Sequence, residues 1–206
     1  MQVIDMETWP RREAFTFFSG MSQPFYSVTF RLDVTRLKAY TKEHGLSFYY
    51  ALVWLTTKAL NEVENFRYAI SEGRAVLLDR RLPSFTDLHP GAEQFHIVTI
   101  PEIGDDIETF CAAAKERSAG QKTFLDGDDT EDLIYFSCLP WVEITSVTNE
   151  RDFDPDDSVP RIAWGKYAEE GGRQRLQMSL ELNHRFVDGL HIGRFYEILS
   201  KMIETL

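Results

Sequence analysis

The 206-residue sequence predicts an α+β fold, a two-layer sandwich in which helices cover one face of a mixed β-sheet. The first observation is a set of long helical patterns, of which the apolar stretch 48–64 is the longest. The second is a series of short strand-like runs separated by turn residues such as Glu72 and Gly73. Because no linker, low-complexity tract or repeat interrupts the chain, a single domain over 1–206 is expected.

The predicted elements follow from local signals. Pro10 sits early in the first helix, Gly45 ends the second, and Ser47 is a good N-cap for the third. Helices are expected over 9–19, 34–43, 48–64 and 104–118, and at the C-terminus, with Ile192, Phe195, Leu199, Met202 and Leu206 on one stripe. Strands are expected over 25–32, 66–71, 74–79, 84–89, 95–101, 133–137, 141–147, 161–167 and 174–184. Loops are expected over 119–132 and 149–158.

Composition narrows the class of protein. Hydrophobic residues make up 43% of the chain, which is typical of a folded domain, and the net charge of −11 argues against nucleic acid as a partner. Cys111 and Cys138 lack metal-type spacing and are interpreted as free thiols in a reducing compartment. Neither a signal peptide nor a membrane-spanning stretch is recognised, so a cytoplasmic protein with no membrane partner is expected.

One strand carries a candidate for chemistry at its end. Apolar residues alternate with polar ones from Leu176 onward, and the apolar face ends on His184, four residues before Asp188-Gly189. An imidazole near neutral pH is a common general base, but a core histidine bonded to backbone explains the spacing equally well. A metal site of His184, Asp188 and His191 is a weaker alternative, because a helix starting at Asp188 would direct His191 along a different axis. Asp188 also suits a helix N-cap.

Four motifs in order extend this hypothesis. HRFVDGLHIGRF (184–195) resembles the signature of the chloramphenicol acetyltransferases, a family of trimeric enzymes that use acetyl-CoA. WPRREAFTFF (9–18) is similar to the opening helix of that family, FSCLPWVEI (136–144) to its serine segment, and GKYAEEGGR (165–173) to the stretch before its last strand. The resemblance covers nearly the whole chain and implies the fold already expected.

The resemblance also implies roles for particular residues. His184 would be the general base on the acceptor hydroxyl, and Ser137 would stabilise the oxyanion. Arg11 would pair with Asp188; if that pair is buried, removal of one partner typically costs roughly 3–5 kcal/mol. Tyr167 would lie near the adenine of CoA. No metal is implied, and a homotrimer with sites between subunits is expected.

The chain departs from the family pattern in the acceptor region. A family tyrosine that binds an acceptor hydroxyl aligns with Phe18, and a threonine near the reacting centre aligns with Ala163. Tyr26 and Phe95 align with apolar pocket positions, and Asn183 replaces the histidine that usually precedes the base. Because phenylalanine can neither donate nor accept as tyrosine does, the acyl-transfer machinery looks kept while the acceptor pattern is altered.

Three functions remain open. The leading hypothesis is an acetyl-CoA-dependent O-acetyltransferase with chloramphenicol as acceptor, and hence a role in antibiotic resistance. A dihydrolipoyl acyltransferase core shares HRxxDG, with Arg185 after the histidine, but the chain shows no lipoyl domain. A non-catalytic small-molecule binding protein on the same fold is the third, because Phe18 and Ala163 alter the pocket.

Overall fold

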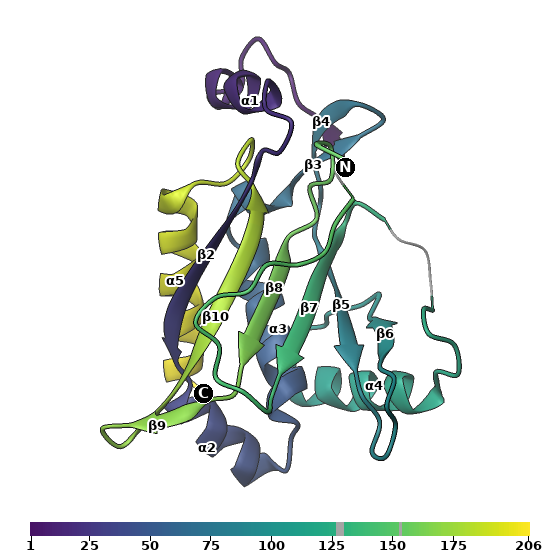
Figure 1. Cartoon of the computed structure of the whole chain (residues 1–206), viewed down its shortest axis with the longest axis vertical. Coiled ribbons are helices and arrows are strands. Elements are labelled where there is room, and N and C mark those ends of the chain that lie inside the picture. Colours follow the sequence, from purple (N-terminus) through teal and green to yellow (C-terminus); the bar gives the residue numbers. More distant parts are fainter. Residues whose placement is uncertain (127–129, 153) are drawn as a thin grey trace.

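The computed structural model describes residues 1–126, 130–152 and 154–206. Its main sheet has the strand order β2-β10-β8-β7-β5-β6, with β9 paired to β10 (Figure 1). The strands are β2 (Phe25–Asp33), β5 (Leu82–Asp87), β6 (His96–Thr99), β7 (Leu133–Leu139), β8 (Arg161–Gly165), β9 (Ala168–Glu170) and β10 (Arg173–Asn183). Since β5, β7 and β8 run parallel and the other neighbours antiparallel, the predicted mixed sheet is confirmed.

A smaller sheet of order β1-β4-β3 stands beside the main one. Its strands are β1 (Gln2–Val3), β4 (Arg74–Leu77) and β3 (Tyr68–Ser71), and the short 3-10 helix η1 (Glu64–Arg67) leads into it. The predicted hairpin over 66–71 and 74–79 is therefore confirmed, but it belongs to this small sheet, whereas the next predicted strand enters the main one.

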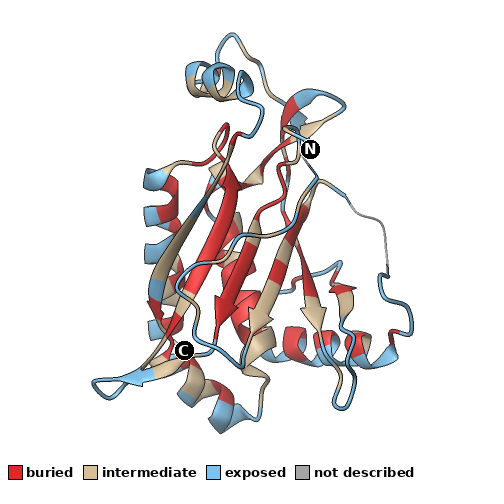
Figure 2. Ribbon diagram, in the orientation of Figure 1, coloured by how far each residue is buried: buried red, intermediate tan, exposed pale blue. Residues whose placement is uncertain are grey.

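Helices cover one face of the main sheet, as the sequence predicts. They are α2 (Thr35–His44), α3 (Phe48–Asn61), α4 (Ile107–Gly120) and α5 (Gly189–Glu204), whereas α1 (Arg12–Ser19) lies beyond one end of the sheet (Figure 1). The Ser47 side chain caps α3 by accepting from the amide of Tyr50. Nine of the ten residues from Ala51 to Leu60 are buried. Figure 2 shows burial concentrated in β8, β10 and the helices behind them, whereas α1 is exposed on its outer side.

The alternation in β10 divides its residues between the two faces of the sheet. Leu176, Met178, Leu180 and Leu182 belong to the core beneath the helices. Ser179 lies on the opposite face, where its hydroxyl accepts a hydrogen bond from Thr29. The face of the sheet without helices is called the open face below.

A fully buried arginine fixes the start of β5. The guanidinium of Arg81 has 0% exposure, and it donates to the backbone carbonyls of Phe66, Tyr68, Glu131, Leu133 and Ser158. Burial lowers the pKa of Arg81 to about 9, although the negative charges of Asp132, Asp157 and Glu131 act to raise it. The carbonyls replace lost hydration and join both sheets at one point.

The predicted strand over 141–147 is wrong. Both neighbours of β8 are already present, β7 on one side and β10 on the other, so no free strand edge remains there. The connection between β7 and β8 instead crosses the open face, where the Ser179 hydroxyl donates to the Val147 carbonyl (Figure 1). The predicted loops 119–132 and 149–158 contain 127–129 and 153, which lie outside the described residues.

Gly165 allows this connection to pass close to β8. A Cβ at Gly165 would lie 2.8 Å from both the amide nitrogen of Ile144 and the carbonyl oxygen of Val142. That carbonyl accepts the amide of Lys166, so it is held in place. The close approach of two backbones explains why the position carries no side chain.

We therefore expect Gly165→Ala to lower the free energy of unfolding by about 1–3 kcal/mol, because the methyl group overpacks fixed backbone atoms. Urea unfolding followed by tryptophan fluorescence measures the change. Gly193→Ala is the matched control, since a Cβ there meets no atom within 4 Å. Equal stability of the two variants would contradict the packing argument.

Candidate active site

His184 lies in the turn that follows β10. Its amide donates to the carbonyl of Pro24 at 2.6 Å, and its Nδ1 lies 3.0 Å from the carbonyl oxygen of Val187. Since a carbonyl can only accept, Nδ1 carries the proton of the neutral ring. The lone pair is therefore on Nε2. This tautomer is the one that a base acting through Nε2 requires.

Two aromatic rings hold the imidazole of His184 between them. Phe18 of α1 stacks on it with ring centroids 4.1 Å apart, and Tyr26 of β2 packs at 4.3 Å. The Tyr26 hydroxyl donates to the same Val187 carbonyl at 3.2 Å. Burial, followed by the charge of Asp188, raises the pKa of Tyr26 to about 12 against the effect of Arg11, so this phenol remains a neutral donor.

Arg11 fixes the backbone on which His184 is carried. Its guanidinium donates to the carbonyls of His184 at 3.0 Å and Arg185 at 2.8 Å, and to the carboxylate of Asp188 at 2.7 Å. Burial raises the pKa of Asp188, but the hydrogen bond and charge of Arg11, helped by His191 and His184, outweigh it, and the net pKa is lowered. The Asp188 side chain is 38% exposed, so the pair is only partly buried, and we expect less than the cost of a buried pair.

Asp188 is also the N-cap of α5, as the sequence suggested. Nδ1 of His191 lies 3.1 Å from the amide nitrogen of Asp188 and 2.9 Å from the carboxylate of the same residue. Burial lowers the pKa of His191, and the nearby carboxylate opposes this effect. His191 is therefore tied to Asp188, whereas Nδ1 of His184 contacts the backbone of Val187.

Ser137 lies elsewhere, in a large groove. The groove has a volume of about 910 Å³, within the range of ligand pockets, and runs over the open face and the carboxyl ends of β5 and β7. Ser137 projects into it beside Tyr135, and Phe95 and Phe124 form an aromatic rim with ring centroids 5.4 Å apart. Trp141 is 69% exposed at its edge.

Ser137 and His184 of one chain cannot act on the same bond. Ser137 pairs with Ala163, which pairs with Ser179, five residues before His184 on β10. Two strand spacings of about 4.8 Å and five residues of about 3.3 Å place the two Cα atoms about 19 Å apart. His184 is also not among the described residues that line the groove.

The remaining predicted site residues lie in three places. Phe18 and Tyr26 contact His184, Phe95 lines the groove, and Ala163 is buried in the sheet next to Ser137. Tyr167 follows β8, where Lys38 lies over its ring at 4.6 Å. The set therefore divides between the turn, the groove and the far end of β8.

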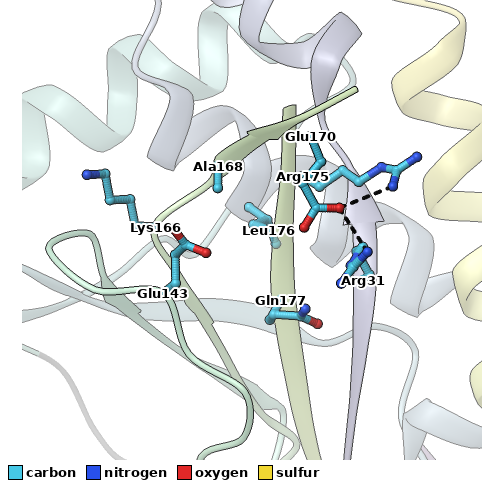
Figure 3. A pocket seen from close by; sticks show the side chains of 8 residues that line it. All are labelled: Arg31, Glu143, Lys166, Ala168, Glu170, Arg175, Leu176 and Gln177. Carbon is cyan, nitrogen blue, oxygen red and sulfur yellow. Dashed lines mark hydrogen bonds and ion pairs between the residues drawn. The ribbon is translucent and has the colours of Figure 1, made fainter. Parts of the chain in front are cut away.

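A second recess lies near Tyr167 but is very small. Its volume of about 20 Å³ is that of a water site, and Lys166 and Glu143 lie at its rim (Figure 3). Glu170 forms ion pairs with Arg31 at 2.9 Å and with Arg175 at 3.3 Å. These pairs neutralise part of the positive charge of the recess. We do not place the reaction in this recess.

The described part of the chain holds no cluster of metal-ligating side chains and no activated thiol in the groove. Residues 1–126, 130–152 and 154–206 contain no group of three or more His, Cys, Asp or Glu side chains that could hold a metal ion. Burial raises the pKa of Cys138 in the groove to about 12, so the thiol is a poor nucleophile. None of the described helices is long and apolar enough to cross a membrane.

Comparison with known proteins identifies first the fold and then the family. A solved probable dihydrolipoamide acetyltransferase from Listeria monocytogenes shares the fold, with a TM-score of 0.65 at 14% identity over 96% of this chain and 92% of that one. A solved chloramphenicol acetyltransferase matches with a TM-score of 0.89 at 27% identity over 98% of this chain and 99% of that one. Chloramphenicol acetyltransferase 2 of Escherichia coli is 28% identical over 98% of this chain and 97% of its own length.

The family model for chloramphenicol acetyltransferase matches residues 1–200. The chain belongs to this family of acyltransferases, and the resemblance drawn from its four motifs is confirmed.

Some contacts of the site were missed in the sequence. Asn183 and Arg185, on either side of His184, are both buried and bond to residues 155–157. The sequence marks Arg185 only as part of the HRxxDG pattern and Asn183 only as a departure from the family pattern. Their burial follows from contacts with residues 155–157, for which the sequence carries no signal.

We expect Arg11→Lys to destabilise the protein by about 1–3 kcal/mol, because one ammonium group cannot reach the two carbonyls and the carboxylate that the planar fork satisfies. Chemical denaturation at pH 7 measures this. Arg12→Lys on the exposed side of α1 is the control. If the two substitutions lowered the free energy of unfolding equally, the Arg11 guanidinium would not be the group that holds the turn.

Proposed function

We propose that the chain is an acetyl-CoA-dependent O-acetyltransferase in which His184 is the general base and Ser137 stabilises the oxyanion. The observation that carries this proposal is the state of His184. Its Nδ1–H is bonded to the Val187 carbonyl at 3.0 Å, so Nε2 keeps its lone pair, and rings on both sides fix the plane of the imidazole. A structural core histidine does not require a free Nε2.

The proposed reaction is a direct transfer. Nε2 of His184 takes the proton of the acceptor hydroxyl as the oxygen attacks the thioester carbonyl carbon of acetyl-CoA. The hydroxyl of Ser137 donates to the oxygen that becomes negative in the tetrahedral intermediate, which typically contributes about 3–4 kcal/mol. The C–S bond then breaks, the imidazolium returns its proton to the CoA sulfur, and the products are an acetyl ester and free CoA.

The active site is proposed to form between copies of the chain in a homotrimer. The separation of about 19 Å between the Cα atoms of Ser137 and His184 argues against a site within one chain, because general-base and oxyanion contacts both need about 3 Å. Exposed aromatic residues at the groove rim, including Phe95, Phe124 and Trp141, favour coverage by another subunit. A neighbour that inserts its His184 into the groove beside Ser137 would complete the catalytic pair.

Chloramphenicol is the leading acceptor, because the relatives that carry its name align over nearly the whole chain. The large aromatic groove supports a ring-bearing acceptor of drug size. Acetyl-CoA would lie with its adenine near Tyr167, on the far side of Ser137 from the acceptor.

Release of free CoA tests the function directly. Purified protein with acetyl-CoA is assayed with a thiol reagent, with chloramphenicol, with reduced lipoamide and with a panel of alcohols. Chloramphenicol-dependent release that is lost in His184→Ala supports the proposal. A wild-type protein that forms the expected oligomer but releases no CoA with any acceptor would refute it.

A complementation experiment tests the division of the site between chains. His184→Ala and Ser137→Ala should each lose at least about a hundredfold in kcat. After unfolding and refolding together at equal amounts, we expect about a quarter of wild-type activity, because random mixing unites an intact histidine with an intact serine at that share of interfaces. No recovery in mixed oligomers, verified by mass spectrometry, would show that the two groups do not meet across an interface between subunits.

The ring of Phe18 gives a test of acceptor recognition. In Phe18→Tyr we expect the KM for chloramphenicol to fall about three- to tenfold, the effect of one added hydrogen bond, with the KM for acetyl-CoA unchanged. Phe17→Tyr is the matched control, because Phe17 is 66% exposed on the same helix. If both variants kept the wild-type KM, recognition of the acceptor hydroxyl would not involve this ring.

A further inference from the structure

We propose that residues 155–157 form a clamp that positions the base, acting through Asn183 and Arg185 on either side of His184. The clamp is part of the connection that crosses the open face between β7 and β8 (Figure 1). The inference rests on the proposed role of His184 as base. It makes Asn183 and Arg185 positioning residues that do not touch the substrate.

Asn183 joins the end of β10 to the clamp. Asn183 is 5% exposed, and its Nδ2 donates to the carbonyls of Pro155 at 3.1 Å and Asp157 at 3.0 Å. Its Oδ1 accepts the amide of Arg185 at 3.0 Å. The amide group therefore uses both its donors on the clamp and its acceptor on the turn, and it fixes the backbone on each side of His184.

Arg185 makes the second connection. Its guanidinium is buried, it forms an ion pair with Asp156 at 2.9 Å, and it donates to the carbonyl of Pro155. Its Nε donates to Oδ1 of Asn183 at 3.2 Å. Because the two side chains bond to each other as well as to the clamp, a shift of either one moves the backbone of His184 between them.

The clamp is itself anchored to the sheet. Asp157 pairs with Arg151 at 3.1 Å and Arg161 at 2.7 Å, and Arg151 also pairs with Glu181 of β10 at 2.7 Å. The side chains of Arg151, Asp157, Arg161 and Glu181 are 7–17% exposed, so solvent screens these pairs little. A weakly held surface loop could not fix the turn, but this network can.

A clamp of this kind matters because the tautomer of His184 depends on the shape of the turn. The bond from Nδ1–H to Val187 spans only three residues, and a hydrogen bond weakens steeply as its distance and angle depart from ideal values. Arg11 holds the carbonyl side of the turn, and the clamp holds the positions that flank the histidine. Loss of the clamp should release Nδ1 without removing any group that touches substrate.

Asn183→Asp tests this with a nearly isosteric change. A carboxylate keeps the acceptor for Arg185 but cannot donate to the two clamp carbonyls. We expect kcat to fall about tenfold, with both KM values within twofold of wild type. Asn183→His, which restores an N–H donor, should recover most of the lost rate. Asp105→Ala removes a fully exposed partner of Lys58 and is the control.

Histidine ¹⁵N NMR without substrates gives an independent measurement. We expect the wild-type His184 signals to show Nδ1 protonated, and those of Asn183→Asp to show a mixture of tautomers. If Asn183→Asp proves too unstable, Asp156→Ala, at a half-exposed position, is expected to shift the signals in the same direction.

Wild-type ¹⁵N signals and kcat in a folded Asn183→Asp would overturn the clamp. A wild-type protein that transfers no acetyl group would instead refute the proposed function, and the NMR measurement would still decide the positioning.

Discussion

The local structure of the turn after β10 depends on the guanidinium of Arg11. It connects a residue near the start of the chain to three acceptors on His184, Arg185 and Asp188. A single planar fork can satisfy all three because its donors diverge in one plane. The turn is thereby held at the carbonyls of His184 and Arg185. The His184 side chain can remain partly exposed while the peptide units that carry it are held.

The sequence predicted the parts of the fold that depend on local patterning. Alternation identified β10 and the face on which its apolar residues pack, and continuous apolar density identified α3 as buried. It failed at 141–147, where a run with good strand propensity crosses the open face. Propensity describes whether a segment suits a sheet, but the availability of a free edge is decided by which other strands are already paired.

The candidate site was predictable as a set of residues, but its geometry was not. Motif order identified His184, Ser137, Arg11 and Asp188, and the Arg11–Asp188 ion pair is present in the structure. Sheet register is a long-range property. Nothing in the sequence indicated that Ser137 of β7 lies level with Ser179 of β10, five residues before His184. The partners of Asn183 could not be predicted either, because they come from a segment with no regular secondary structure.

The separation of His184, the proposed base, from Ser137, the proposed oxyanion donor, has a consequence for how specificity can change. His184 is fixed by Arg11, Phe18, Tyr26 and backbone, whereas Ser137 stands in a groove whose rim is formed largely by side chains of loops and edge strands. Substitutions at the rim therefore alter what is bound without disturbing the turn. Phe18 is the exception, since its ring packs on His184 and, by the family resemblance, occupies a proposed acceptor-binding position. Under the proposed function a change there would affect recognition and catalysis together, because the same ring stacks on the imidazole.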